Sequence, residues 1–322
     1  MFSGSSEGAN LGRMGNGAEA PGRRNMPRIA GLALAALMVL GFAVPAAASE
    51  NSKHDRDNST LFATGLAPTA VPGGNRVLLA IDVERGMTTV IGPAVGSLAP
   101  NSLALAITPD GTAAYTIANS FSAAAAQLAK IDLATGAQTL VGRPIGADLK
   151  IMGMTFSPDG VLYAAGDFVT TSPTFNSLYT IDLRTGAPTR VGSLGAGPNA
   201  TDYIMSFVFD SHGNMYGASP KALYKIHLPD AEGGEARTQE AGQGAQALAT
   251  KVVGFIGSAQ VMGIAIGEDG NFYAADFVPA PTRSTIYGLN VETGFLTPLF
   301  KTGIANVHNI AFVPERQRGH HE

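Results

Sequence analysis

Short runs of alternating apolar and polar residues fill the chain from about residue 60 to residue 315. Alternation with a period of two predicts β-strands whose two faces meet different surroundings. Pairs of these runs are joined by Asp-Gly or His-Gly turns, which favour tight hairpins. One such hairpin pattern occurs four times, with turn glycines that are 49, 53 and 57 residues apart: Gly111, Gly160, Gly213 and Gly270.

A second pattern lies between the copies of the first. It is an apolar strand that ends in Asp, His or Asn before a turn, and a further short strand follows the turn. Together the two patterns predict a repeated four-stranded antiparallel meander, whose strands we call A, B, C and D in chain order. The second pattern begins at Val77, Gln127, Ser177, Ala222 and Thr285.

The two ends of this region complete the repeat. Strands B, C and D occur five times, but the first B strand, at residues 60–66, has no A strand before it. The missing A pattern stands at the other end, from His308 to Val313. The sequence therefore predicts an all-β fold, a single β-propeller of five four-stranded blades closed by the two termini. A β-sandwich would explain neither the spacing nor the complementary ends.

The N-terminal region predicts an export signal. Arg23, Arg24 and Arg28 precede a 16-residue apolar run at 29–44, and a small-residue A-x-A site follows it. A membrane span needs about 20 apolar residues, so an uncleaved anchor is the alternative to a signal peptide. We expect a signal peptide at 1–48 with Met26 as a possible true start, a linker at 49–59, the propeller at 60–315 with a mobile insertion at 230–250, and a tail at 316–322. The predicted location is secreted or periplasmic, by general or twin-arginine export.

Composition removes several classes of function. The chain has no cysteine, which excludes disulfides, thiolate metal sites and cysteine nucleophiles. Its formal net charge of -4 gives no basic footprint for nucleic acid. No G-x-S-x-G elbow, P-loop or H-E-x-x-H segment occurs. We therefore expect no nucleic-acid partner and, after signal cleavage, no membrane partner.

The repeats resemble those of known proteins. The turns SPDG and TPDG, the strands NFYAAD and VLYAAGD and the segment LYTIDLRTG are similar to repeats of secreted bacterial propellers of the NHL, YVTN and TolB type. The resemblance implies an architecture rather than a reaction, because such propellers include lactonases, lyases, cofactor-binding subunits and binding scaffolds. It also implies that functional groups gather at the channel mouth formed by the B-to-C loops and the D-to-A connections.

Positions that recur in every blade are best explained as structural. An aromatic column in strand B is expected to pack between blades, and a Leu/Met column at the start of strand A is expected to fill core gaps. His227 occupies the column of turn-forming Asp residues, so we interpret it as a turn residue. The aromatic column is Phe62, Tyr115, Tyr163, Tyr216 and Tyr273, and the Leu/Met column is Leu103, Met152, Met205 and Met262.

Departures from the repeat supply the candidate chemistry. His308 stands in the Leu/Met column and Asn309 in a column of small residues. His308 is a candidate general base or metal ligand, the alternative being a buried histidine that binds backbone where the ring closes. The candidate catalytic residues are His308, Asp202 and Lys150. The candidate ligand-binding residues are Asn119, Tyr203, Asn306 and Asn309. Asp167, Asp202 and Asp276 are candidate ligands of Ca²⁺, or else caps of inter-blade loops.

Two functions remain open. The first is a secreted binding module or scaffold that recognises a polymer, glycan or protein through its loop-rich channel mouth. The alternative is a Ca²⁺-assisted hydrolase, lactonase or lyase with an Asp/His site at the central channel. Every Glu after residue 48 lies in a tail, in the insertion or in turns of the opposite face, whereas a propeller glycosidase needs two carboxylates beside the scissile bond. This distribution favours the binding module.

Overall fold

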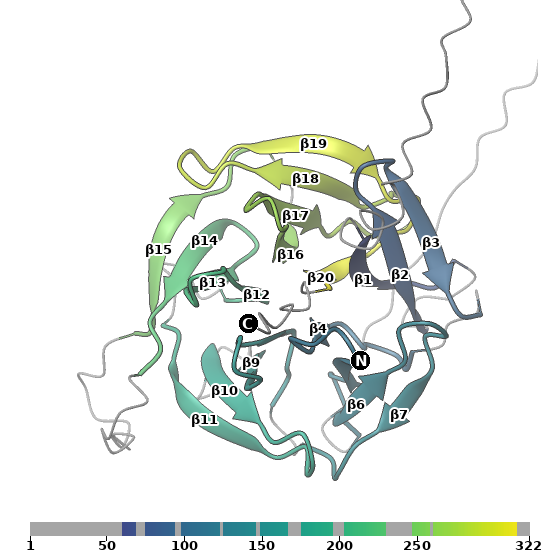
Figure 1. Cartoon of the computed structure of the whole chain (residues 1–322), viewed down its shortest axis with the longest axis vertical. Helices are drawn as coiled ribbons and strands as arrows, with labels where there is room; N and C mark the ends of the chain where they lie inside the picture. Colours follow the sequence, from purple (N-terminus) through teal and green to yellow (C-terminus); the bar gives the residue numbers. More distant parts are fainter. Residues whose placement is uncertain are drawn as a thin grey trace, which may run out of the picture. The chain divides into compact units, whose positions relative to one another are not determined.

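A computed structural model describes residues 60–68, 75–93, 98–122, 125–145, 149–166, 175–195, 203–229, 247–257 and 260–313. Within these ranges the regular structure is β-strand and turn, without helix. Five four-stranded antiparallel sheets follow one another around a central axis (Figure 1). The prediction of a five-bladed β-propeller is confirmed. No helix long and apolar enough to span a membrane occurs in the described part of the chain.

In every blade, strand A lies next to the axis and strand D lies at the outer rim (Figure 1). The blades, each given from A to D, are blade 1, β20 (His308–Phe312), β1 (Thr60–Leu66), β2 (Arg76–Asp82) and β3 (Met87–Ile91); blade 2, β4 (Ala106–Ile107), β5 (Ala114–Ala118), β6 (Gln127–Ile131) and β7 (Gln138–Leu140); blade 3, β8 (Gly153–Phe156), β9 (Leu162–Gly166), β10 (Ser177–Ile181) and β11 (Pro188–Ser193); blade 4, β12 (Ser206–Phe209), β13 (Met215–Ala218), β14 (Ala222–Ile226) and β15 (Ala249–Gly254); and blade 5, β16 (Val261–Ile266), β17 (Phe272–Asp276), β18 (Thr285–Leu289) and β19 (Leu296–Lys301).

The ring closes as predicted. β20 pairs antiparallel with β1, so that Phe62 faces Ala311 and Ala63 faces Ile310. The register shifts at Thr64, which faces His308. Figure 1 shows the last strand of the chain beside the first. Closure through strand pairing leaves no blade with an unpaired B strand, which is the usual liability of an open sheet.

Aromatic contacts join neighbouring blades. One aromatic pair lies at each of four blade boundaries, those between blades 2 and 3, 3 and 4, 4 and 5, and 5 and 1. The two ring centroids of each pair are 5.3 to 5.9 Å apart, a distance typical of edge-to-face and tilted contacts. This confirms that the strand-B column packs between blades. The pairs are Tyr115–Phe156, Tyr163–Phe209, Tyr216–Phe272 and Tyr273–Phe312.

The remaining parts of the predicted domain plan lie largely outside the described residues. The signal peptide at 1–48, the linker at 49–59 and the tail at 316–322 stay predictions. The insertion expected at 230–250 overlaps the described strand β15, since Ala249 pairs with Ile226 and Thr250 pairs with Lys225. The strand therefore begins before the end of the predicted loop, because the partner strand supplies hydrogen bonds up to Ile226.

Candidate functional site

Two of the three candidate calcium ligands, Asp167 and Asp202, lie outside the described residues. The third, Asp276, ends β17 and is buried. Its Oδ1 accepts a hydrogen bond from the Thr285 amide at 2.7 Å, and its Oδ2 accepts one from the Tyr287 hydroxyl at 2.8 Å. Both oxygens thus tie the start of β18 to the end of β17. Among the described residues, no group of three or more His, Asp or Glu side chains is placed to hold a metal ion.

His308 is buried at the start of β20. Its ring lies edge-on to Phe277, with 5.2 Å between the ring centroids, and its Nδ1 has no hydrogen-bond partner. Burial in these surroundings holds the pKa of His308 well below 6.5, and the positive charge of Arg76 lowers it further. The imidazole is therefore neutral at neutral pH.

The other candidates lie around this end of the ring. Lys150 and Tyr203 are half-buried, and Tyr203 packs against the Leu/Met column. Asn119 has a positive φ and donates its amide to the Pro100 carbonyl at 3.1 Å. Asn306 also has a positive φ and contacts Arg76. Asn306, His308 and Asn309 are close in the sequence and belong to one short segment that enters the innermost strand of blade 1.

A buried arginine, which the sequence reasoning did not single out, lies beside His308. Arg76 begins β2 and donates to Asn306 Oδ1 at 3.2 Å, to the Asn306 carbonyl at 2.6 Å and to the Thr64 carbonyl at 3.2 Å. Burial lowers the pKa of Arg76 to about 9, so the guanidinium is still charged at neutral pH. It joins blade 1 to the segment that precedes β20. Its column holds Ala126, Asn176, Lys221 and Ser284 in the other blades, so a charged residue there is not peculiar to blade 1 and gave no signal of a buried guanidinium.

The His308 end of the central passage is closed. Asn309 donates through Nδ2 to the Met152 carbonyl at 2.6 Å and to the Met205 carbonyl at 3.3 Å. Met152 and Met205 precede the inner strands of blades 3 and 4, which are the blades opposite blade 1 in a ring of five. The Asn309 amide therefore crosses the axis. Beside it the column of Leu103, Met152, Met205 and Met262 forms one buried hydrophobic cluster, as predicted.

The inner strands also approach one another closely at this level. A Cβ atom added to Gly153 would lie 2.6 Å from the carbonyl oxygen of Met205, a distance that real Cβ atoms do not show. One added to Gly263 would lie 3.0 Å from the Ile310 nitrogen. Small residues are thus required where the strands converge, and no room remains for a ligand between them.

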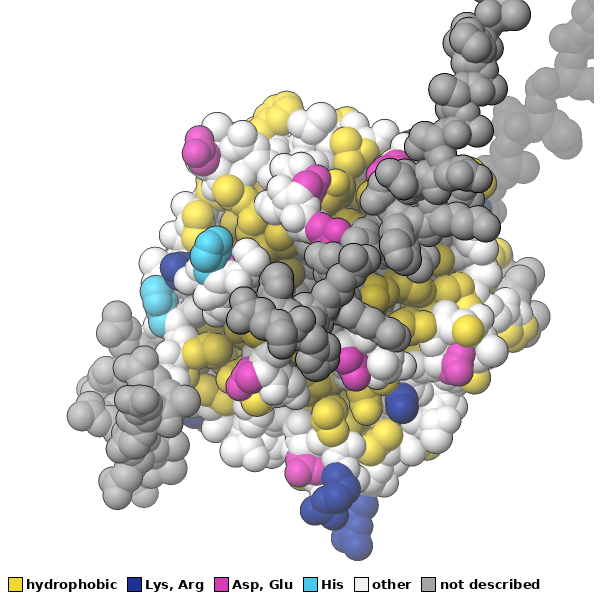
Figure 2. Space-filling model, in the orientation of Figure 1, with side chains coloured by type: hydrophobic (Ala, Val, Ile, Leu, Met, Phe, Trp, Pro, Cys, Tyr) yellow, Lys and Arg dark blue, Asp and Glu magenta, His cyan; other side chains and the backbone are white. Residues whose placement is uncertain are grey.

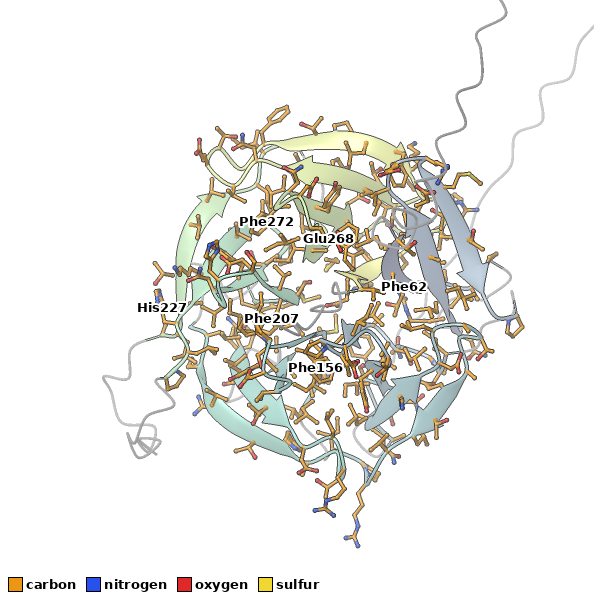
Figure 3. The ribbon with its side chains drawn as sticks, viewed as in Figure 1. Phe62, Phe156, Phe207, His227, Glu268 and Phe272 are labelled. Carbon is orange, nitrogen blue, oxygen red and sulfur yellow. The ribbon has the colours of Figure 1, made fainter. Side chains whose placement is uncertain are left out.

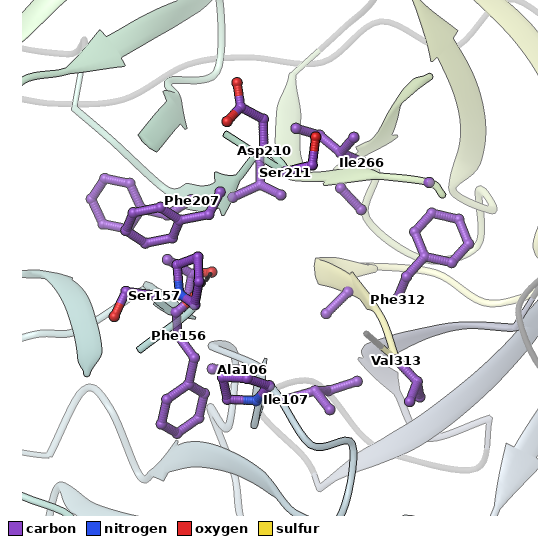
Figure 4. Close-up of a pocket in the computed structure, with 18 of the residues that line it drawn as sticks. Ala106, Ile107, Phe156, Ser157, Phe207, Asp210, Ser211, Ile266, Phe312 and Val313 are labelled. Atoms are coloured by element: carbon purple, nitrogen blue, oxygen red, sulfur yellow. Dashed lines mark hydrogen bonds between the residues drawn. The ribbon is translucent and has the colours of Figure 1, made fainter. Parts of the chain in front are cut away.

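At the opposite end of the passage the described residues leave a cavity. A cavity of about 880 Å³ lies among the A-to-B turns and the ends of the inner strands. Residues from all five blades surround it (Figure 4). Five phenylalanines contribute to its lining, two of which, Phe156 and Phe207, are labelled both in the view of the whole ribbon (Figure 3) and in the close-up (Figure 4). The five are Phe156, Phe207, Phe209, Phe272 and Phe312.

Polar groups reach this cavity from two sources. Each inner strand is the terminal strand of its sheet, so one edge of its backbone has no strand partner and faces the axis. Carboxylates and hydroxyls of the A-to-B turns stand at the mouth, where Glu268 is one of the lining residues (Figure 3). The sequence reasoning placed Glu268 on the face opposite the expected site, and this is the face that holds the described cavity. The polar side chains of the lining are Asp110, Thr155, Ser157, Asp210, Ser211, His212 and Glu268.

The chain matches no protein-family profile and no curated protein at a significant level. Solved structures resemble it weakly. Hydrazine synthase of Kuenenia stuttgartiensis aligns at 14% identity over 62% of this chain and 48% of that chain, with a TM-score of 0.37. The PQQ-bound form of an aldose sugar dehydrogenase from Streptomyces coelicolor aligns at 17% identity over 67% and 73%, with a TM-score of 0.43. A gluconolactonase from Xanthomonas campestris aligns at 14% identity over 74% and 71%, with a TM-score of 0.44.

The chain spans about half the length of the first of these proteins. At such TM-scores and identities the likenesses carry no argument about activity, so the site must be judged on its own geometry.

Replacing His308 by methionine should make the free energy of unfolding less sensitive to acid. Because the pKa of His308 is lower in the fold than in the unfolded chain, the unfolded state binds more protons below pH 6.5. Stability is therefore full above pH 6.5 and falls as the pH drops, by about 1 kcal/mol at pH 5.5. His308→Met should show a smaller loss of free energy of unfolding between pH 7.5 and 5.5, measured by urea denaturation.

The control is His212→Gln, which changes an exposed histidine and should keep the wild-type pH dependence. An equal slope in His308→Met and the wild type would contradict the buried, neutral state of the imidazole.

Proposed function

We propose that this propeller is a binding module and that its ligand places an apolar group in the cavity among the A-to-B turns. The observation that carries the proposal is the contrast between the two ends of the passage. One end is closed by the Asn309 amide and the Leu/Met cluster, whereas the other holds about 880 Å³ of apolar-walled space. Binding pockets for small ligands range from about 300 to 1,000 Å³ and have largely apolar walls with a few polar groups.

The cavity walls explain how a ligand would be held. Phenylalanine rings offer apolar surface, which stabilises binding in proportion to the area removed from water. The unpaired edges of the inner strands offer backbone donors and acceptors that can orient a polar part of the ligand. A small molecule fits this description directly, and a polymer, glycan or protein can present an end or a side group in the same way.

Contact of a large partner with the predicted loop-rich face stays a separate prediction. The longest loops of that face, at 167–174 and 196–202, lie outside the described residues. The enzymatic alternative also stays a prediction, because the described ranges contain only Asp276 of the three candidate calcium ligands, and both oxygens of Asp276 accept hydrogen bonds from the chain itself.

A neutral apolar dye tests the proposal. N-phenyl-1-naphthylamine should show saturable fluorescence enhancement with the full chain, because its aromatic rings leave water for the cavity. Ser211→Trp places an indole at the mouth from an exposed turn position and should weaken dye binding about tenfold, equal to about 1.4 kcal/mol.

The matched control is Ala134→Trp, which changes an exposed C-to-D turn residue that is outside the cavity lining. It should bind dye as the wild type does. Absence of saturable binding by the wild type, or equal weakening in both variants, would refute the cavity as the binding site.

A further inference from the structure

This inference rests on the proposed function and concerns the chemical class of the ligand. We propose that the cavity selects an amphipathic organic cation, a molecule in which an aromatic or aliphatic group carries a positive charge close to it. The apolar group enters the cavity, and the charge stays at the mouth among the carboxylates of the turns.

Negative charge is concentrated on the face that contains the cavity. The A-to-B turns contain five carboxylates and, in the described residues, no Lys or Arg. The described C-to-D turns, which share this face, add five carboxylates against Arg85 and Arg184. The acidic residues are Asp110, Asp159, Asp210, Glu268 and Asp269 in the A-to-B turns, and Asp82, Glu84, Asp132, Asp182 and Glu292 in the C-to-D turns.

Ten carboxylates against two arginines give these turns a net charge of -8, counting histidine as neutral, whereas the whole chain has a formal net charge of only -4. The described turns of this face are therefore more acidic than the chain as a whole. Figure 2, which views this face, shows several acidic side chains distributed among hydrophobic ones. Such an arrangement raises the local concentration of cations at the mouth.

Turn geometry keeps two of the lining carboxylates ionised. Hydrogen bonds from the Thr108 hydroxyl and from the amide and hydroxyl of Thr112 lower the pKa of Asp110 to about 2. Partial burial raises the pKa of Asp210, but hydrogen bonds from the Asn214 side chain and amide and from the His212 amide outweigh it and leave that pKa lowered. A carboxylate has about four acceptor positions, so these bonds leave capacity to meet a cation.

The lining itself has the matching character. Three carboxylates, those of Asp110, Asp210 and Glu268, belong to it, and its described residues include no Lys or Arg. An anionic ligand such as a sugar phosphate or a carboxylic acid would approach three carboxylates at this mouth.

Two ions of nearly equal shape and opposite charge separate this inference from the proposed function. Tetraphenylphosphonium and tetraphenylborate should be tested for displacement of bound N-phenyl-1-naphthylamine from the full chain at low ionic strength. We expect the cation to bind at least about tenfold more tightly than the anion. The difference in affinity should shrink in about 0.5 M NaCl, because salt at this concentration strongly screens charges.

A single charge change at the mouth supplies the second measurement. Glu268→Gln should weaken binding of tetraphenylphosphonium about threefold and strengthen binding of tetraphenylborate. Glu292→Gln, at an exposed C-to-D turn outside the cavity lining, is the matched control and should have a smaller effect on both ions.

The possible failures are distinct. Equal displacement by both ions, or tighter binding of the anion, would overturn charge selection while the dye still showed a functional cavity. Failure of the dye and of both ions to bind would overturn the proposed function and this inference with it. If Glu268→Gln and Glu292→Gln changed ion binding equally, the charge of the whole face would account for the preference, and selection by carboxylates at the cavity mouth would be overturned.

Discussion

Replacing Asn309 by leucine should lower the free energy of unfolding by about 3 kcal/mol, the sum of two lost hydrogen bonds in a buried site and of a backbone penalty. The Asn309 amide donates to the carbonyls of Met152 and Met205 across the axis. Its φ of 32° lies in the left-handed region, which asparagine tolerates better than leucine does. The branched side chain would also have to fit beside Gly263, where the strands already converge. Urea denaturation would measure the change.

Asn101→Leu separates the two contributions. Asn101 has a φ of 56° but lies in a turn and makes no side-chain hydrogen bond in the described structure, so its replacement tests the backbone penalty alone, about 1 kcal/mol. If Asn309→Leu cost no more than Asn101→Leu, the cross-axis hydrogen bonds would contribute nothing to stability.

Replacing Gly153 by alanine should also cost about 3 kcal/mol, at the upper end of the usual cost of overpacking. The new methyl group would lie 2.6 Å from the Met205 carbonyl oxygen and 2.8 Å from its carbon, so the inner strands of blades 3 and 4 would have to separate. The backbone at Gly153 is not in the left-handed region, and the cost is therefore steric. Thermal and chemical denaturation should both report it.

Gly288→Ala is the matched control, since Gly288 also lies within a strand but its added Cβ would find its nearest neighbour at 4.0 Å. It should be neutral or slightly stabilising, because alanine loses less backbone entropy than glycine on folding. Equal stability of the two variants would show that blades 3 and 4 can move apart at no cost.

The fold was predictable because every blade repeats the same physical pattern. Alternating strands and Asp-Gly turns fix the hairpins locally, and the missing strand before Thr60 together with the extra strand at His308 fixes the closure. The aromatic column was predictable for the same reason, since a residue type that recurs once in each blade must occupy equivalent surroundings in each.

The site was less predictable because it depends on differences among blades. The sequence shows that His308 and Asn309 depart from their columns, but it does not show that the Asn309 side chain reaches across the axis. It also gives no measure of how far the inner strands diverge, so it could not indicate which end of the passage stays open. Arg76 was missed because its column holds a different residue in each blade, including the charged Lys221, so the repeat did not mark Arg76 as a departure.

The amide of Asn309 makes the central passage blind at one end, so the passage is not a through-channel. A polysaccharide or polypeptide cannot be threaded through it and slide along it. Such a chain can offer only a terminus or a protruding group, which must leave by the same opening through which it came. A partner bound in this way would dissociate through the opening by which it entered. Linear polymers that have neither accessible ends nor protruding groups should therefore not bind in the cavity.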